Sequence, residues 1–194
     1  DGSEFRPFLD SRPILAELEA IHRALLYAEE TGCRIHVVHV SNPRGVELIR
    51  RAAAEGRVDA TCETCPHYLL LTEEDMERIG PRAKCAPPLR DDATRRALIE
   101  ELASGRIDTV GSDHSPAPAE LKETGSFLDA WGGIAGVQTT LRGLLTLGLE
   151  PQRIAAVLAS NPARRFAMPK KGGIEIGNEA NIALVDAGAS SRLE

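Results

Sequence analysis

Three times along this chain, a short run rich in β-branched and other apolar residues is followed by a segment with helical periodicity. The first run covers residues 34–40, the second 58–62 and the third 107–112. Strands that alternate with helices are joined by right-handed crossovers and form a parallel sheet. We therefore predict an α/β fold that contains three parallel βα units.

Capping residues and glycines mark the ends of the predicted helices. A helix over residues 14–28 has Ser11 as its candidate N-cap and Gly32 at its end. Ser41-Asn42-Pro43 supplies a cap and a first-turn proline for the helix that follows the first strand and ends at Gly56. Further helices are expected over residues 91–104, 134–147 and 151–158.

Both an open doubly wound sheet and a closed barrel agree with this alternation. No G-x-G-x-x-G or G-x-x-x-x-G-K-[ST] element follows any of the predicted strands, which argues against an open nucleotide-binding sheet. Polar residues instead gather just past the strand ends, where (β/α)8 barrels carry their chemistry. A whole barrel needs eight strands and about 250 residues, so three strands in 194 residues predict only part of one.

Composition excludes several classes of protein. With 42% apolar residues, the chain can bury a sizeable core, and its net charge of −6 without a run of Lys or Arg argues against a nucleic-acid partner. No apolar stretch approaches the roughly 18 residues of a membrane span, and no signal region is recognised, so we expect no membrane partner and a cytoplasmic location. The four cysteines lack the density of a disulfide scaffold and are expected to be free thiols.

The two ends of the chain have a different character. Gly2-Ser3, Glu4-Phe5 and Leu193-Glu194 are dipeptides that restriction sites commonly encode. We interpret residues 1–5 and 191–194 as derived from cloning and leave them out of the fold prediction. The natural segment then runs over about 6–189 and is expected to be part of a longer protein.

Two histidines belong to the first predicted strand. Period-two alternation puts His36 and His39 on opposite faces, so both are poorly placed to bind one metal ion. His39 lies nearer the carboxyl end of the strand, where an imidazole is a suitable zinc ligand. A hydrogen-bonded core histidine is the alternative interpretation.

Asp113 directly follows the third predicted strand. Gly111 permits close backbone approach there, and His114 and Ser115 add polar groups. A carboxylate in such a place needs a cation or a hydrogen-bond donor nearby. It is either catalytic or a loop carboxylate satisfied by backbone N–H groups.

Three further motifs carry weaker signals. Cys62 and Cys65 form a C-x2-C pair with His67 close by, but a closed zinc site needs a fourth ligand, so a structural zinc site is disfavoured. The proline-rich loop 84–90 is stiff enough to present backbone amides to a ligand, or it is a structural turn. Trp131-Gly132-Gly133 is expected to allow close backbone approach at a helix start.

Taken in order, these motifs resemble the cyclic amidohydrolase family, which contains dihydroorotases, hydantoinases and allantoinases. Cys65-Pro66-His67-Tyr68, Lys84-Cys85-Ala86-Pro87-Pro88-Leu89-Arg90 and Trp131-Gly132-Gly133-Ile134-Ala135-Gly136 are most similar to the allantoinase group. Ala117 departs from it, because cysteine is frequent there in that group. The resemblance covers residues 8–13, 36–41, 63–68, 84–90, 111–116, 131–136 and 160–163.

The resemblance implies the C-terminal part of a (β/α)8 TIM-type barrel over residues 6–169. Residues 170–189 would begin the return into the small accessory β-sandwich. It implies two bridged divalent metal ions, most simply zinc, with His39 as a metal ligand and Asp113 as both ligand and general base. His67 matches a position that is not a ligand in the family. Backbone groups near Ala86 and Gly132 would bind the ring of the substrate, with Arg90 or His114 in support.

The implied reaction is metal-dependent hydrolysis of a cyclic C–N bond in a small ureide or amide. Allantoin opening to allantoate is the first expectation for the full-length parent, and a dihydroorotase or hydantoinase activity is the alternative. The family's remaining metal ligands lie upstream of this segment, so we expect the 194-residue chain alone to be inactive or weakly active. A non-enzymatic half-barrel that self-associates as a homo-oligomer is the competing hypothesis.

Overall fold

Three short parallel strands form the central sheet in the order β1-β2-β3. In the computed structural model, which describes residues 5–186, 188 and 189, these strands are β1 (Ile35–Val37), β2 (Ala60–Thr64) and β3 (Thr109–Val110). Ile35 lies beside Ala60, and Glu63 beside Thr109. The predicted parallel βα units are confirmed, although β1 and β3 are shorter than their apolar runs and β2 begins and ends two residues later than predicted.

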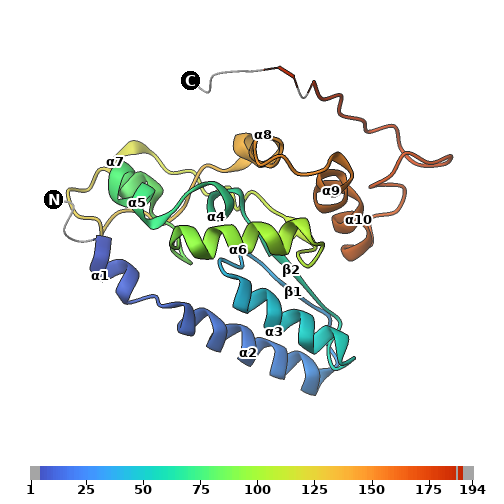
Figure 1. The fold of residues 1–194 in the computed structure, drawn as a ribbon, viewed down its shortest axis with the longest axis horizontal. Helices are drawn as coiled ribbons and strands as arrows, with labels where there is room; N and C mark the ends of the chain where they lie inside the picture. The colour runs from blue at the N-terminus through green and yellow to red at the C-terminus, as the bar shows by residue number, and fades with distance from the viewer. Residues whose placement is uncertain (1–4, 187, 190–194) are drawn as a thin grey trace.

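Three long helices cover one side of this sheet. They are α2 (Ile14–Thr31), α3 (Pro43–Ala54) and α6 (Asp92–Ala103), and α3 lies between the other two and contacts both (Figure 1). Each helix turns an apolar stripe inward because its apolar residues recur at helical spacing. The buried members of these stripes are Leu18, Ile21, Leu25 and Ala28 in α2, Val46, Ile49 and Ala52 in α3, and Leu98 and Leu102 in α6.

Short elements fill the connections and the two ends of the described chain. The long connection between β2 and α6 is packed rather than open, because Tyr68, Leu69 and Met76 are buried in the core. No helix in the described part of the chain has both the length and the apolar character to cross a bilayer. The short elements are α1 (Phe5–Asp10), α4 (Pro66–Leu70), α5 (Glu73–Ile79), η2 (Gly80–Ala83), α7 (Ala119–Lys122), η3 (Val137–Thr139), α8 (Thr140–Thr146), α9 (Pro151–Ala155), η4 (Ala156–Ser160) and α10 (Asn161–Arg165).

The predicted helix ends are largely confirmed. Asn42 caps α3 by accepting a hydrogen bond from the Gly45 N–H at 3.0 Å, and Gly32 ends α2 with a left-handed φ of 67°. The prediction that Ser11 caps α2 is wrong, since Pro13 occupies that position. Ser11 instead follows α1, a helix that the periodicity did not predict, and its hydroxyl donates to the Phe8 carbonyl at 2.8 Å.

The C-terminal part differs more from expectation. The helix predicted over 151–158 is α9, which continues into the π-helical turn η4 and then α10. Residues 170–186 run past these helices as irregular chain without a strand (Figure 1), so the return into a β-sandwich stays a prediction. Residues 1–4 and 191–194, interpreted as cloning-derived, lie outside the described residues, whereas Phe5 is buried in the core.

Candidate active site

His39 and Asp113 both lie just past the carboxyl ends of their strands, β1 and β3. Each has a left-handed backbone, with φ of 43° for His39 and 44° for Asp113. Such a conformation costs a residue with a Cβ about 1–2 kcal/mol. His39 is half-buried and Asp113 is exposed. The alternation that puts His36 and His39 on opposite faces therefore holds only within the strand, because β1 ends at Val37 and the chain turns at His39.

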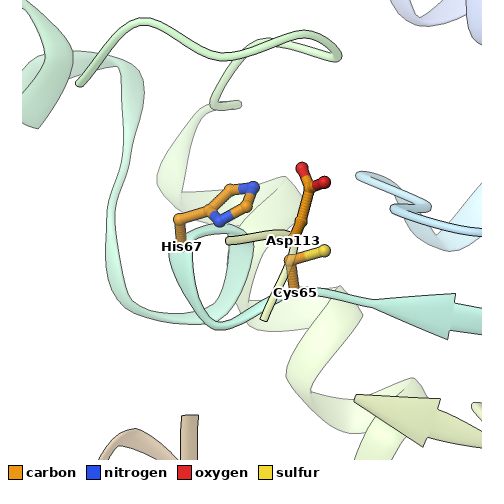
Figure 2. Close-up of side chains that lie close together, drawn as sticks. All are labelled: Cys65, His67 and Asp113. Carbon is orange, nitrogen blue, oxygen red and sulfur yellow. The ribbon is translucent and has the colours of Figure 1, made fainter. Parts of the chain in front are cut away.

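Asp113 lies in a cluster with Cys65 and His67. One ligand-type atom of each residue lies within 4.8 Å of the others. Cys65 follows β2, His67 belongs to the first turn of α4, and Asp113 reaches the cluster from the loop after β3 (Figure 2). Parallel strands bring these side chains together because their carboxyl ends meet at the same edge of the sheet.

Burial sets the protonation of the two inner members of this cluster. It lowers the pKa of His67 to about 4, while the Asp113 charge raises that pKa and His39 lowers it. It also raises the pKa of the Cys65 thiol, as does the charge of Asp113. His67 therefore carries a neutral ring at pH 7, and His39 and Asp113 both lie near enough to influence it.

The side chains of His39 and Asp113 are of the kind that bind a divalent metal ion. The Asp113 carboxylate is exposed and accepts no hydrogen bond from any described residue, so it is not the loop carboxylate satisfied by backbone N–H groups. Carboxylate and imidazole are the donors that zinc and similar ions prefer. His39 and Asp113 thus have the right chemical character for metal ligands.

The loop after His39 is held by Arg90. Its guanidinium donates to the Ser41 hydroxyl at 3.0 Å and to the Glu17 carboxylate at 3.0 Å, and the Ser41 N–H donates to the same carboxylate at 2.8 Å. Arg90 and Glu17 form an ion pair whose side chains are each only 10% exposed. Arg90 thus fixes the turn that carries His39.

His39 and Ala86 line the same groove. This groove, of about 360 Å3, runs between α2, β1 and the proline-rich loop, and its lining is mostly apolar. Ala86 itself is exposed. The structure therefore brings Ala86 near His39, whereas Asp113, His114 and Gly132 do not line this groove.

The loop over residues 131–136 packs against the segment that contains Asp113. The Val137 N–H donates to His114 Nδ1 at 3.3 Å, and the Ser115 N–H donates to the Ile134 carbonyl at 3.0 Å. A Cβ added to Gly136 would lie 2.3 Å from the Ser112 carbonyl oxygen. His114 is thus tied to this loop by a ring nitrogen.

The glycine expectations are only partly correct. Gly111 does allow close approach, because a Cβ there would lie 2.3 Å from the Glu63 carboxylate. In the Trp131-Gly132-Gly133 motif, the expected helix start is wrong, since no helix begins there, and nothing lies within 4 Å of a Cβ added to Gly132. The close contact belongs to Gly133, whose added Cβ would lie 2.5 Å from the Ser115 hydroxyl.

Two buried lysines were missed by the sequence analysis. The Lys84 ammonium donates to the carbonyls of Leu128 and Ala130, both at 2.7 Å. The Lys122 ammonium donates to the carbonyls of Trp131 and Gly133, and burial lowers the pKa of both lysines. Only the apolar surroundings of Lys84 in its motif hinted at burial. These two cations fix the loop that faces the Asp113 segment.

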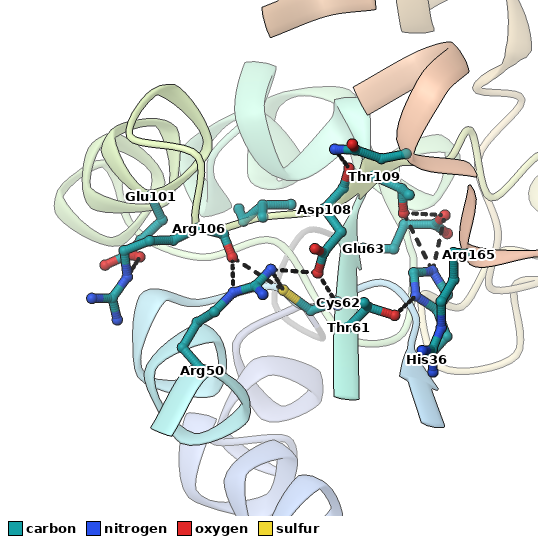
Figure 3. Close-up of polar contacts among 12 residues, drawn as sticks. His36, Arg50, Thr61, Cys62, Glu63, Glu101, Arg106, Asp108, Thr109 and Arg165 are labelled. Carbon is teal, nitrogen blue, oxygen red and sulfur yellow. Dashed lines mark hydrogen bonds and ion pairs between the residues drawn. The ribbon is translucent and has the colours of Figure 1, made fainter. Parts of the chain in front are cut away.

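His36 and Cys62 belong to polar networks away from the rim (Figure 3). His36 contacts the Thr61 hydroxyl at 2.7 Å and the Glu63 carboxylate at 3.6 Å. Cys62 points to the helix layer, where its thiol donates to the Arg106 carbonyl at 3.6 Å. The C-x2-C pair therefore does not converge on one site.

Comparison with known proteins places this geometry in context. Residues 16–193 match the Amidohydrolase family. The chain is 50% identical to an allantoinase of Deinococcus radiodurans, covering 99% of this chain and 44% of that protein, and 54% identical to an allantoinase of Rubrobacter xylanophilus, covering 93% and 41%. Among solved structures, an L-hydantoinase (dihydropyrimidinase) from Arthrobacter aurescens is 44% identical with a TM-score of 0.87, over 91% of this chain and 41% of that one. The chain thus spans less than half the length of the relatives it matches.

Proposed function

Since this chain belongs to the amidohydrolase family, we propose that it is the C-terminal part of an enzyme that opens a small cyclic amide. We propose allantoin as the substrate and allantoate as the product. The observation that carries this proposal is the identity of 50–54% with allantoinases over nearly the whole chain. The expected allantoinase-like motifs lie within this matched region.

Asp113 and His39 have separate roles in the proposed reaction. Both would hold a divalent ion, which we propose to be zinc, and such an ion, when bound, would activate water and polarise the substrate carbonyl. Asp113 takes the proton of the attacking water as the new C–O bond forms, and passes it to the ring nitrogen as the C–N bond breaks. The exposed Asp113 carboxylate, free of hydrogen bonds to the described residues, supports this role.

The supporting residues position these groups. Arg90 fixes the turn after His39 through Ser41 and Glu17. The loop over residues 131–136 and the neighbourhood of Ala86 offer backbone groups for the ureido edge of the ring. His114 Nδ1 accepts a hydrogen bond from the Val137 N–H, so we propose that His114 supports the loop rather than the substrate ring.

The proposal also predicts that the 194-residue chain is a poor catalyst alone. Two protein ligands are too few for a two-metal site, because a catalytic zinc alone normally has three. Purified chain supplied with zinc should open allantoin slowly or not at all. Turnover at the rate of a full-length allantoinase would refute this expectation.

A chimaera tests the function itself. Residues 6–189 would replace the matching segment of the Deinococcus radiodurans relative, and ring opening would be assayed with allantoin, hydantoin, dihydroorotate and dihydrouracil. We expect activity with allantoin, and its loss by at least about 100-fold in Asp113→Asn, the lower range for removal of a general base. Asp129→Asn, a change of the same kind outside the proposed site, should retain activity.

The alternative substrate class is a hydantoin. The 44% identity to the L-hydantoinase favours it as the second candidate. A well-folded chimaera that opens hydantoin but leaves allantoin untouched would refute allantoin as substrate. Full activity in Asp113→Asn would refute the assignment of the general base.

Self-association of the isolated chain is a separate proposal. β1 and β3 each pair on one side only within the described sheet, which leaves two strand edges available to a second copy. We expect a homo-oligomer by analytical ultracentrifugation. A strict monomer at all concentrations would contradict it.

A further inference from the structure

We propose that Cys65, His67 and Asp113 form a site for a single thiophilic divalent cation of the zinc type. The three donors are a thiol sulfur, an imidazole nitrogen and a carboxylate oxygen, all within 4.8 Å of one another. A small movement of these side chains would bring all three to one ion, since zinc binds sulfur at about 2.3 Å and nitrogen or oxygen at about 2.0–2.2 Å. This site shares Asp113 with the proposed function but has Cys65 and His67 in place of His39, and it does not depend on that function.

The burial of His67 without hydrogen-bond partners is an independent observation that points to a bound ion. Its ring is 4% exposed, and both ring nitrogens are buried without a hydrogen-bond partner. A buried polar group without a hydrogen-bond partner destabilises the folded state, so natural cores seldom retain such a group without a role. A cation bound to one nitrogen would satisfy it.

The packing of His67 leaves its nitrogens unused. The ring meets Tyr68 edge to face, with centroids 4.2 Å apart and planes at 62°. The Tyr68 hydroxyl donates to the Pro87 carbonyl at 2.8 Å and so is already engaged. The neighbouring aromatic residue therefore packs against the ring of His67 and gives no hydrogen bond to it.

Cys65 likewise makes no side-chain hydrogen bond within the described part of the chain. It occupies the N-cap position of α4, but its side chain makes no capping hydrogen bond. Its thiol is fully buried beside His67, and Asp113 forms the exposed side of the cluster (Figure 2). An ion would enter from the Asp113 side. The sulfur would then select zinc-type ions over magnesium or calcium, which prefer oxygen donors.

Both proposed sites need the same carboxylate. An ion held by Cys65 and His67 would draw Asp113 away from His39. In a complete enzyme, excess thiophilic metal would therefore compete with the use of Asp113 as a base. Binding at the new site can nevertheless be measured without any catalytic assay.

Cadmium is the probe for the test, because its bond to a thiolate gives an ultraviolet charge-transfer band. Metal-free 194-residue chain would be titrated with Cd2+, following this band together with calorimetric stoichiometry. We expect one Cd2+ per chain with the band present. Cys65→Ser should abolish the band and weaken binding at least tenfold, about the smallest loss seen even for outer-shell partners of metals.

Matched variants separate this site from the alternatives. His67→Gln and the exposed Asp113→Asn should each weaken binding, and Asp113→Asn is expected to fold normally because it is a surface change. Cys33→Ser, which removes the exposed thiol, and His39→Asn should leave the band intact. Circular dichroism would confirm that each variant is folded.

Three outcomes would overturn the proposal. One is the absence of Cd2+ binding. Another is a band that survives Cys65→Ser or disappears in Cys33→Ser, which would locate the ion at another thiol. The third is a folded Asp113→Asn variant that binds Cd2+ as tightly as the unchanged chain, or a loss of the band in His39→Asn.

Discussion

Replacing Gly136 with alanine should separate the loop over residues 131–136 from the segment that contains Asp113. The added Cβ would lie 2.3 Å from the Ser112 carbonyl oxygen and 3.3 Å from its carbon. Both are backbone atoms, so no rotation of a side chain relieves the overlap. The φ of Gly136 is −91°, which alanine adopts freely, so the predicted effect is purely steric.

The loop has little freedom to move away. The Gly136 carbonyl accepts hydrogen bonds from the Thr139 N–H at 3.1 Å and from the hydroxyls of Thr139 and Thr140 at 2.9 and 3.1 Å. Overpacking of this kind costs about 1–3 kcal/mol. For a chain of this size, each kcal/mol lowers the Tm by about 2–4 °C, so we expect a fall of about 2–12 °C.

Thermal unfolding followed by circular dichroism measures this effect, with Gly132→Ala as the matched control. An added Cβ at Gly132 has nothing within 4 Å, and its φ lies outside the left-handed region. That change should be neutral or stabilising by up to about 1 kcal/mol, since alanine restricts the unfolded chain. Equal Tm values for the two variants would refute the steric reasoning.

Four further predictions concern stability and thiol reactivity. Asn42→Ala removes the cap of α3 and should lower the free energy of unfolding, measured in urea, by about 1 kcal/mol. Ser11→Ala removes no helix N-cap and should lower it less, and equal losses would contradict this. Arg90→Met leaves the Glu17 charge without its ion-pair partner and should lower the free energy of unfolding by about 3–5 kcal/mol. The double variant Arg90→Met/Glu17→Gln should lose less stability than the sum of the two single changes, and strict additivity would argue against a coupled pair. A thiol reagent should modify only Cys33 in the folded chain, because the other three cysteines, Cys62, Cys65 and Cys85, are buried. Burial also raises their pKa values, to about 11 for Cys62 and about 12 for Cys85. Rapid modification of a second thiol would contradict this. Burial holds the pKa of His67 near 4, below its unfolded value of about 6.5, so the unfolded chain binds the proton first as pH falls, and the free energy of unfolding drops by up to about 1.4 kcal/mol per pH unit between these values. In metal-free urea unfolding at pH 7 and pH 5, His67→Gln should therefore lose less stability on acidification than the unchanged chain. Equal losses would contradict this.

The sequence predicted the features that depend on neighbouring residues. Asn42 is a cap because its side chain reaches the N–H of Gly45, the third residue of α3, and the order of strands and helices follows from local periodicity. The Ser11 cap failed because α1 ends there, and its short stretch has too few turns to show a clear period. The close approach expected of Trp131-Gly132-Gly133 is made by Gly133 and not by Gly132, and sequence alone cannot distinguish neighbouring glycines until their partners are known.

The features that were missed depend on contacts between distant segments. His67 and Asp113 meet because β2 and β3 pair with Thr64 beside Val110, and nothing in the apolar pattern of either strand sets that register. Lys84 and Lys122 are buried because carbonyl groups of the loop over residues 128–133 surround their ammonium groups. A lysine in an isolated sequence looks the same whether it is solvated or enclosed.

The left-handed turns at His39 and Asp113 set a limit for protein engineering. Glycine adopts that backbone without a Cβ penalty, so it would fit either position with less strain. A selection for thermal stability alone would therefore favour glycine at both positions, and would remove the imidazole and carboxylate on which the proposed chemistry depends. Stabilised variants of this chain should be chosen with both positions held fixed, because here robustness and activity favour different residues.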